Sequence, residues 1–119
     1  VEEAEPGAIR AAAHEDINLI TLLLSGSKPG LQARDSDGAW HDIACDPGMI
    51  TINNGDMLAL ATGNHFPSTT HRVTNPDAGQ NVSRYSMPMF LHPRPDAQLT
   101  ADVTADRYLQ KRLKEIGLK

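Results

Sequence analysis

The sequence has a single cysteine, no long apolar run and no excess of basic residues. Because Cys45 alone cannot form a disulfide within the chain, a reducing compartment fits, and we expect a cytoplasmic protein. No apolar run approaches the roughly 20 residues that span a bilayer, so we expect no membrane partner. The opening residues, VEEAEPGAIRAAA, match neither a signal peptide nor a transit peptide, and they lack an initiator methionine.

The charge balance argues against nucleic acid as a partner. The formal net charge is -4 at pH 7, whereas phosphate binding requires clustered lysine and arginine. One basic cluster lies near the C-terminus, and its helical spacing is typical of a solvated helix face. It consists of Arg107, Lys111, Arg112 and Lys114.

Short apolar runs, broken by turn residues at close intervals, predict an antiparallel β-sandwich or barrel. The 119 residues are enough for one domain with a modest core. Every break contains Gly, Pro, Asn or Asp, which adopt the dihedral angles that turns need. The candidate strands are 9–14, 19–24, 31–34, 39–44, 49–52, 57–62, 69–74 and 83–90.

Turn and helix signals set the limits of this β-domain. Asp37-Gly38 favours a hairpin turn, NPDAGQN at 75–81 a further turn, and the prolines of HPRP at 92–95 the end of the last strand. Apolar residues at helical spacing from about Thr104 to Ile116 predict a C-terminal helix. We therefore expect a leading segment (1–9), a β-domain (10–95), and a C-terminal linker with a helix (96–119).

The stretch HEDINLITLLL places three ionisable residues directly before an apolar run. Burying an unpaired charge is costly, so these charges need partners or a function. On a strand, His14 and Asp16 would point to one face and Glu15 to the other. An imidazole and a carboxylate at this spacing can chelate a metal ion, although a hydrogen-bonded pair explains most isolated H-x-D sequences.

A third ligand is available in STTHRV, a β-prone stretch that contains His71. Two histidines and one carboxylate make the facial triad of non-haem Fe(II) oxygenases, which leaves coordination positions open for O₂ and a cosubstrate. In RYSMPMF, Arg84 and Ser86 would also share one strand face, where a guanidinium and a hydroxyl can hold a carboxylate. An isolated R-x-S is an ordinary surface pair, so the signal lies in the order of the motifs.

The motifs HED at 14–16, GLQAR, DGAW, NNGDML, STTHRV and RYSMPMF together resemble the catalytic domain of the isopenicillin N synthase-like 2-oxoglutarate/Fe(II)-dependent dioxygenases. The resemblance covers residues 10–95. It implies a double-stranded β-helix (jelly roll) in which His14, Asp16 and His71 hold Fe(II). It also implies that Arg84 and Ser86 bind the distal carboxylate of 2-oxoglutarate.

The activity that the resemblance implies is oxidative decarboxylation of 2-oxoglutarate to succinate and CO₂. This reaction would be coupled to hydroxylation, desaturation or cyclisation of a small organic substrate, with O₂ as oxidant and ascorbate as a further candidate cofactor. Two alternatives remain open: a 2-oxoglutarate-independent Fe(II) oxidase of the same family, and a non-catalytic jelly-roll binding module.

The resemblance also carries expectations outside the five site residues. Family members have a longer N-terminal region before H-x-D, so we expect that part of the jelly roll to be missing here and to act as a partner. Leu31 and Gln32 resemble a strand that faces the cosubstrate, although a core position fits nearly as well. Glu15 is expected to face away from the metal and to be dispensable, and 53–56 to form a turn.

Overall fold

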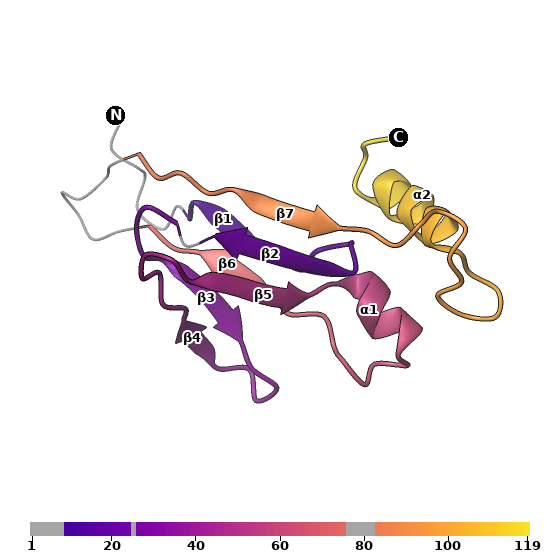
Figure 1. The fold of residues 1–119 in the computed structure, drawn as a ribbon, viewed down its shortest axis with the longest axis horizontal. Coiled ribbons are helices and arrows are strands. Elements are labelled where there is room, and N and C mark those ends of the chain that lie inside the picture. Colours follow the sequence, from indigo (N-terminus) through magenta and orange to yellow (C-terminus); the bar gives the residue numbers. More distant parts are fainter. Residues whose placement is uncertain (1–8, 25, 76–82) are drawn as a thin grey trace. The chain divides into compact units, whose positions relative to one another are not determined.

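The computed structural model describes residues 9–24, 26–75 and 83–119 and consists of short strands and two helices (Figure 1). The leading segment predicted at 1–9 and the turn predicted at 75–81 lie almost entirely outside these ranges. No helix in the described ranges is long and apolar enough to cross a membrane. The elements are β1 (Ala11–His14), β2 (Ile20–Leu24), β3 (Leu31–Arg34), β4 (Trp40–Asp42), β5 (Ile50–Asn54), α1 (Asp56–Ala61), β6 (His71–Val73), β7 (Pro88–Leu91) and α2 (Ala105–Glu115).

The strands form two sheets. The four-stranded sheet has the order β1-β6-β3-β4, and the three-stranded sheet has the order β5-β2-β7 (Figure 1). The chain also divides into two compact units, of which the first contains the four-stranded sheet and the second contains both helices. Three of the boundaries between the units fall inside strands, namely β2, β5 and β7. The prediction of a mainly β chain with a short C-terminal helix is therefore confirmed.

One candidate strand is a helix instead. The run over 57–62 forms most of α1, because methionine, leucine and alanine are strong helix formers. Met57 and Leu60 lie three residues apart and pack into the same core. The turn predicted at 53–56 is also wrong. Its first two residues end β5, and Asp56 begins the helix.

The predicted hairpin is formed by β3 and β4, with Arg34 paired to Trp40. Its turn is stabilised by the Asp35 carboxylate, which accepts backbone N–H hydrogen bonds from Asp37 and Ala39, each 2.9 Å long. Gly38 supplies the left-handed residue of the turn, with φ 86°. The sequence therefore specifies this hairpin locally.

The register of β3 and β6 shows which residues share a face of the four-stranded sheet. Arg72 lies 4.1 Å from the centre of the Trp40 ring and donates from Nε to Gln32 Oε1 (2.8 Å). Gln32 pairs with Arg72, whereas Ala33 pairs with His71, so Gln32 and His71 point to opposite faces. Of the two residues expected to face the cosubstrate, Leu31 therefore shares the face of His71 and Gln32 does not.

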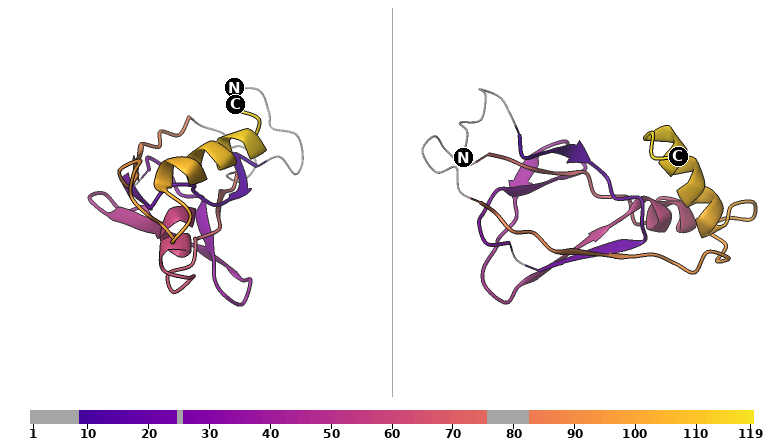
Figure 2. Two further views of the ribbon diagram at one scale, coloured as in Figure 1. Left: turned by 90° about the vertical axis from the view of Figure 1, so that its right-hand side faces the viewer. Right: turned by 90° about the horizontal axis from the view of Figure 1, so that it is seen from above.

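The second unit packs its helices around a small apolar core. Helix α2 begins after Thr104, whose side chain accepts a hydrogen bond from the Arg107 N–H group, so the predicted C-terminal helix is confirmed. Helices α1 and α2 lie side by side (Figure 2), and Tyr108 donates its hydroxyl to Asp56 Oδ2 (3.3 Å). Burial, and then the Asp56 carboxylate, raise the pKa of Tyr108 to about 12, so the hydroxyl stays protonated. The core consists of Met57, Leu99 and Ala105, with Ile17, Leu19, Leu60, Tyr108 and Leu109 packed against it.

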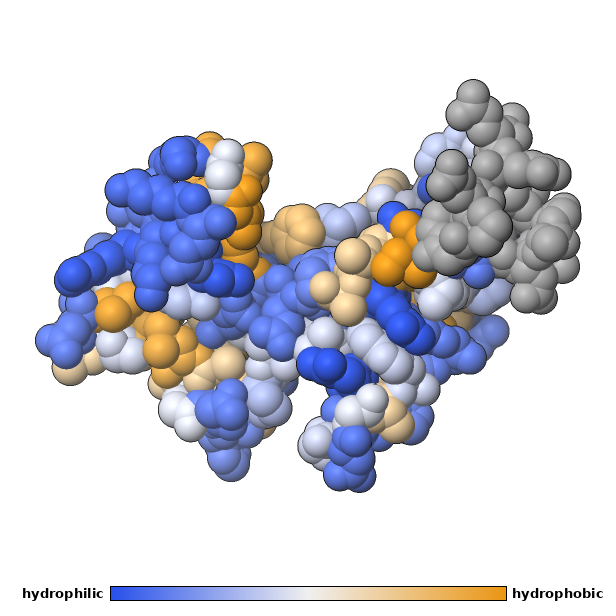
Figure 3. Space-filling model, turned by 180° about the vertical axis from the view of Figure 1, so that it is seen from behind, coloured by the Kyte–Doolittle hydropathy of each residue, from blue (hydrophilic) through white to orange (hydrophobic). Residues whose placement is uncertain are grey.

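Large apolar side chains remain exposed in the described residues, among them Ile52, Met89 and Phe90. Figure 3 shows apolar surface scattered among polar residues on one face of the molecule. This exposed surface contrasts with the few hydrophobic side chains that are fully buried.

Candidate metal centre

His14 and His71 face each other across neighbouring strands. Strand β1 pairs antiparallel with β6, and the register partners are Ala11 with Val73 and His14 with His71. Three steps along β1 therefore match two along β6, which is the signature of a β-bulge. Without the extra residue, strand alternation would turn His14 away from the face of His71. The bulge brings the two ring centroids to 4.3 Å, with the ring planes inclined at 56°.

Each imidazole is oriented by a backbone carbonyl two residues earlier. His14 Nδ1 lies 2.7 Å from the Ala12 oxygen, and His71 Nδ1 lies 3.0 Å from the Thr69 oxygen. A carbonyl can only accept, so Nδ1 carries the proton of each neutral ring. The lone pair that can bind a metal is then on Nε2. Both histidines therefore have the same tautomer, with Nε2 as the atom that can bind a metal.

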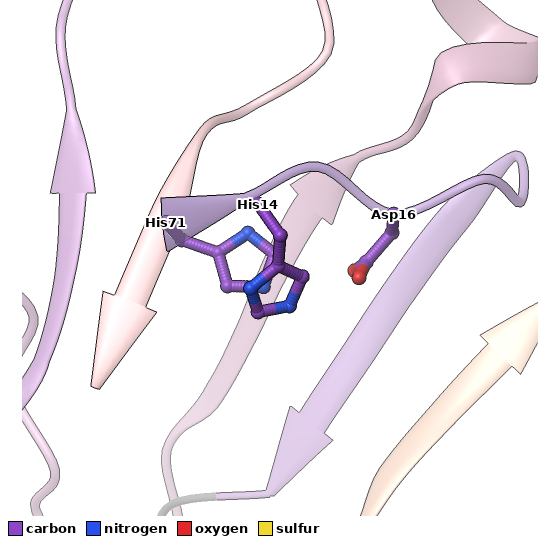
Figure 4. A group of neighbouring side chains, drawn as sticks. All are labelled: His14, Asp16 and His71. Carbon is purple, nitrogen blue, oxygen red and sulfur yellow. The ribbon is translucent and has the colours of Figure 1, made fainter. Parts of the chain in front are cut away.

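Asp16 joins the two histidines from the irregular segment that follows β1. The strand ends at His14, so the alternation argument that placed Asp16 does not apply, and its closeness to His14 follows from their spacing in the chain. One ligand atom from each of His14, Asp16 and His71 lies within 4.8 Å of the other two (Figure 4). The structure thus brings together the three residues that the sequence analysis singled out as a metal site.

Asp16 is only 8% exposed, and two other side chains donate hydrogen bonds to its carboxylate. Thr21 Oγ1 (2.5 Å) and Asn53 Nδ2 (2.9 Å) both donate to Asp16 Oδ2. Asn18 donates in turn to Thr21 Oγ1 (3.0 Å). The sequence analysis missed these contacts, although Asn18 and Thr21 stand out as polar residues within the apolar run INLITLLL.

The segment that carries Asp16 is anchored to the start of α1. Three backbone N–H groups donate to carbonyls of this segment: Gly55 to Leu19 (2.9 Å), Asp56 to Asp16 (2.8 Å) and Met57 to Asn18 (3.1 Å). The first N–H groups of a helix have no intrahelical partners. The helix and the segment therefore satisfy each other's backbone groups, which fixes the position of Asp16.

Arg84 is a half-buried cation in the first unit. Its Nη1 donates to the Pro29 carbonyl (3.4 Å), while its Nε is buried without a hydrogen-bond partner among the described residues. Burial, and then the positive charge of Arg10, lower the pKa of the Arg84 guanidinium. An arginine with an unsatisfied buried donor is suited to binding an anion.

The strand predicted over 83–90 is shorter at its beginning. Strand β7 starts at Pro88, so Arg84 and Ser86 lie in the segment before it rather than on a strand. This segment runs beside Ser27, whose hydroxyl accepts a hydrogen bond from the Tyr85 N–H group (3.1 Å). Ser86 is exposed.

The comparison with family models identifies the chain. Residues 2–93 match the model of the 2OG-Fe(II) oxygenase superfamily. The chain belongs to this superfamily. The resemblance found in the motifs is thereby confirmed, and the donor set of this 2OG-Fe(II) oxygenase, two imidazoles and one carboxylate, fits Fe(II).

Named relatives of this oxygenase come from several groups of organisms. It is 32% identical over 94 residues to a flavonol synthase/flavanone 3-hydroxylase of Eustoma exaltatum subsp. russellianum, covering 79% of the chain and 27% of that protein. A Shewanella oneidensis structure described as an oxygenase superposes with TM-score 0.86 at 51% identity, covering 100% of this chain and 45% of that one. A full-length Neurospora crassa protein, solved with alpha-KG (2-oxoglutarate) and thymine, gives TM-score 0.81 at 30% identity over 94% of this chain and 39% of that one.

These superpositions confirm the jelly-roll fold. The chain spans about a quarter of the flavonol synthase and under half of the two solved chains, by the shares of 27%, 45% and 39%. Its match to each is therefore a match to one part of a longer protein.

Proposed function

We propose that this chain carries the iron centre of a 2-oxoglutarate-dependent dioxygenase. Such an enzyme converts 2-oxoglutarate, O₂ and an organic substrate R–H to succinate, CO₂ and R–OH, or to a desaturated or cyclised product. The observation that carries the proposal is the clustering of His14, Asp16 and His71 within 4.8 Å. When bound, Fe(II) would supply the activation of O₂ that the side chains cannot perform.

In this proposal the protein's own residues supply coordination and orientation. The carbonyls behind His14 and His71 hold both imidazoles with Nε2 as the ligand atom. The burial of Asp16 keeps water away from one side of the centre and strengthens its attraction for a cation.

Arg84 is the proposed anchor for 2-oxoglutarate. A Cβ added at Gly30 would lie 3.1 Å from the Thr74 oxygen and 3.4 Å from Arg84 Nη1, so the guanidinium sits at the Thr74 end of β6. Thr74 follows His71 by three positions, just after β6 ends, which corresponds to a rise of about 10 Å along an extended chain. A five-carbon dicarboxylate can bridge such a separation, with a metal bond at one end and hydrogen bonds at the other. Ser86 is proposed as an additional donor to the same carboxylate.

The organic substrate is proposed to be a small molecule. The hydroxylases among the named relatives support this class, and scopoletin 8-hydroxylase of Arabidopsis thaliana is one of them, at 33% identity over 86 residues. We also propose that further chain, corresponding to the parts of the relatives that this sequence does not match, completes the substrate pocket. The exposed apolar side chains of Ile52, Met89 and Phe90 support such a covering.

The test of the proposed function is succinate formation by the full-length protein. Fe(II) is added anaerobically, its binding is measured, and 2-oxoglutarate and air are then supplied while succinate is followed by mass spectrometry. We expect succinate only when both Fe(II) and 2-oxoglutarate are present. Iron binding without succinate would favour the 2-oxoglutarate-independent oxidase, and a protein that binds no iron would be the non-catalytic module.

Replacing Arg84 should weaken 2-oxoglutarate without weakening iron. The variant Arg84→Gln loses the charged donors, and we expect the apparent affinity for 2-oxoglutarate to fall about 10- to 100-fold, the range for a hydrogen bond to a charged group. Arg94→Gln is the matched control, because the Arg94 side chain is 85% exposed. An Arg84→Gln variant with unchanged 2-oxoglutarate affinity and normal iron binding would refute the role of Arg84.

A further inference from the structure

We propose that Thr21 and Asn53 are positioning residues that make Asp16 bind the metal through its Oδ1 oxygen alone. The inference rests on the proposed function, since it concerns how the same metal centre is held. It assigns a role in the site to two residues that lie outside the motif H-x-D. Neither residue is a ligand, because each acts through the Asp16 carboxylate.

The two donors converge on one carboxylate oxygen. Thr21 Oγ1 donates to Asp16 Oδ2 at 2.5 Å, and Asn53 Nδ2 donates to the same oxygen at 2.9 Å. An oxygen that already accepts two hydrogen bonds has little lone-pair capacity left for a cation. The carboxylate therefore presents Oδ1 as its metal ligand, and a second bond from Oδ2, which would occupy another coordination position, is disfavoured.

The Thr21 hydroxyl has a fixed direction. It has one proton to donate, and Asn18 Nδ2 donates to the same Oγ1 at 3.0 Å. An amide N–H can only donate, so the acceptors within reach of the Thr21 proton are Asp16 Oδ2 at 2.5 Å and Asn18 Oδ1 at 3.4 Å. The proton is directed to Asp16, because that contact is much shorter and its acceptor is charged. Asn18 is 2% exposed and Thr21 is 3% exposed, so water does not compete for these bonds.

Asn53 approaches the carboxylate from a different element. It lies on β5, whereas Thr21 lies on β2, and these strands are neighbours in the three-stranded sheet. The carboxylate is thus held from two strands that are themselves fixed by backbone hydrogen bonds. A ligand held from outside its own segment keeps its orientation when the metal leaves, and partners of this kind commonly change metal affinity when mutated.

The experiment measures Co(II) binding, with Co(II) as a spectroscopic probe for Fe(II), in the full-length protein. The variants are Thr21→Val, which keeps the shape and removes the hydroxyl, and Asn53→Ala. Thr21→Ser restores the hydroxyl, and Asn54→Ala removes the same side chain one position further along β5. We expect the first two to weaken Co(II) about 10- to 100-fold, and the last two to bind as the wild type does.

The visible absorption of the Co(II)-saturated protein separates positioning from general stability. A carboxylate released by Thr21→Val can coordinate through both oxygens, so the band should change shape even at saturation. A merely structural role would lower stability and leave the saturated spectrum as in the wild type, which would overturn the inference. Asn53→Ala provides the same readout should Thr21→Val not fold.

The outcomes distinguish this inference from the proposed function. If the wild type binds Co(II) tightly and both Thr21→Val and Asn53→Ala bind it with unchanged affinity and spectrum, the positioning role is refuted and the metal site stands. If the wild type has no affinity for Co(II) or Fe(II), the proposed function fails and the inference fails with it.

Discussion

An Asp16→Asn variant is expected to lose metal binding while keeping its fold. The amide oxygen can still accept the hydrogen bonds from Thr21 and Asn53, so the local contacts survive, but the negative charge is lost. Replacing a ligand should cost more than the 10- to 100-fold typical of outer partners, so we expect Fe(II) affinity to fall by at least about 100-fold. Isothermal titration under anaerobic conditions measures this change.

Thermal unfolding gives an independent reading of the same variant. A metal at 100 times its Kd stabilises the native state by about 2.7 kcal/mol, and Asp16→Asn should lose this gain. Without metal the variant should remain folded, because the amide oxygen can accept the same two hydrogen bonds. Glu15→Gln is the control, since it removes the neighbouring exposed carboxylate. Equal metal affinity for Asp16→Asn and wild type would exclude Asp16 as a ligand.

The residues of the candidate metal centre could be singled out from the sequence, because only a few residue types bind metals. His14, Asp16 and His71 are the residues that a facial triad requires, and the order of their motifs along the chain made the combination specific. The hairpin around Gly38 was also predictable, because its turn is decided by local dihedral preferences and local hydrogen bonds.

The geometry of the centre could not be predicted from strand alternation. A regular β1 would have placed Ala13, not His14, opposite His71, and Asp16 is not on a strand at all. A bulge sets two residues of one strand against one residue of its partner, so alternation counted along β1 alone fails across it. The pattern therefore singled out three residues that do lie together, but with an incorrect account of how they meet.

The sequence analysis missed helix α1, because a short apolar run is compatible with the periodicity of a strand and with that of a helix. Residues 57–62 satisfy either a strand or a helix, and the choice is made by contacts that are distant in sequence. The N–H groups of Asp56 and Met57 find their acceptors in the segment after His14. Asn53 was assigned to a turn for the same reason, and its contact with Asp16 appeared only in the folded chain.

Gly55→Ala is expected to be the most destabilising single substitution at this helix start. Gly55 has φ −109° and ψ 176°, which alanine tolerates, so the difficulty is space and not dihedral strain. An added Cβ would lie 2.2 Å from the Asn18 carbonyl oxygen and 2.9 Å from its carbon. Both atoms belong to the backbone, so α1 must move away from the segment that carries Asp16.

This movement would strain or break the N–H bonds that Gly55, Asp56 and Met57 make to that segment. Overpacking alone costs about 1 to 3 kcal/mol, and each buried backbone group left unpaired costs about 1 to 3 kcal/mol more. We expect urea unfolding to show a free energy of unfolding lower by at least about 3 kcal/mol, or no folded protein.

Gly48→Ala is the control: its added Cβ meets nothing within 4 Å, so only the strain of φ 86° is tested. Because the displaced segment carries Asp16, any folded Gly55→Ala protein should also bind Fe(II) more weakly. A Gly55→Ala protein as stable as Gly48→Ala would show that the contact between α1 and this segment is not tight.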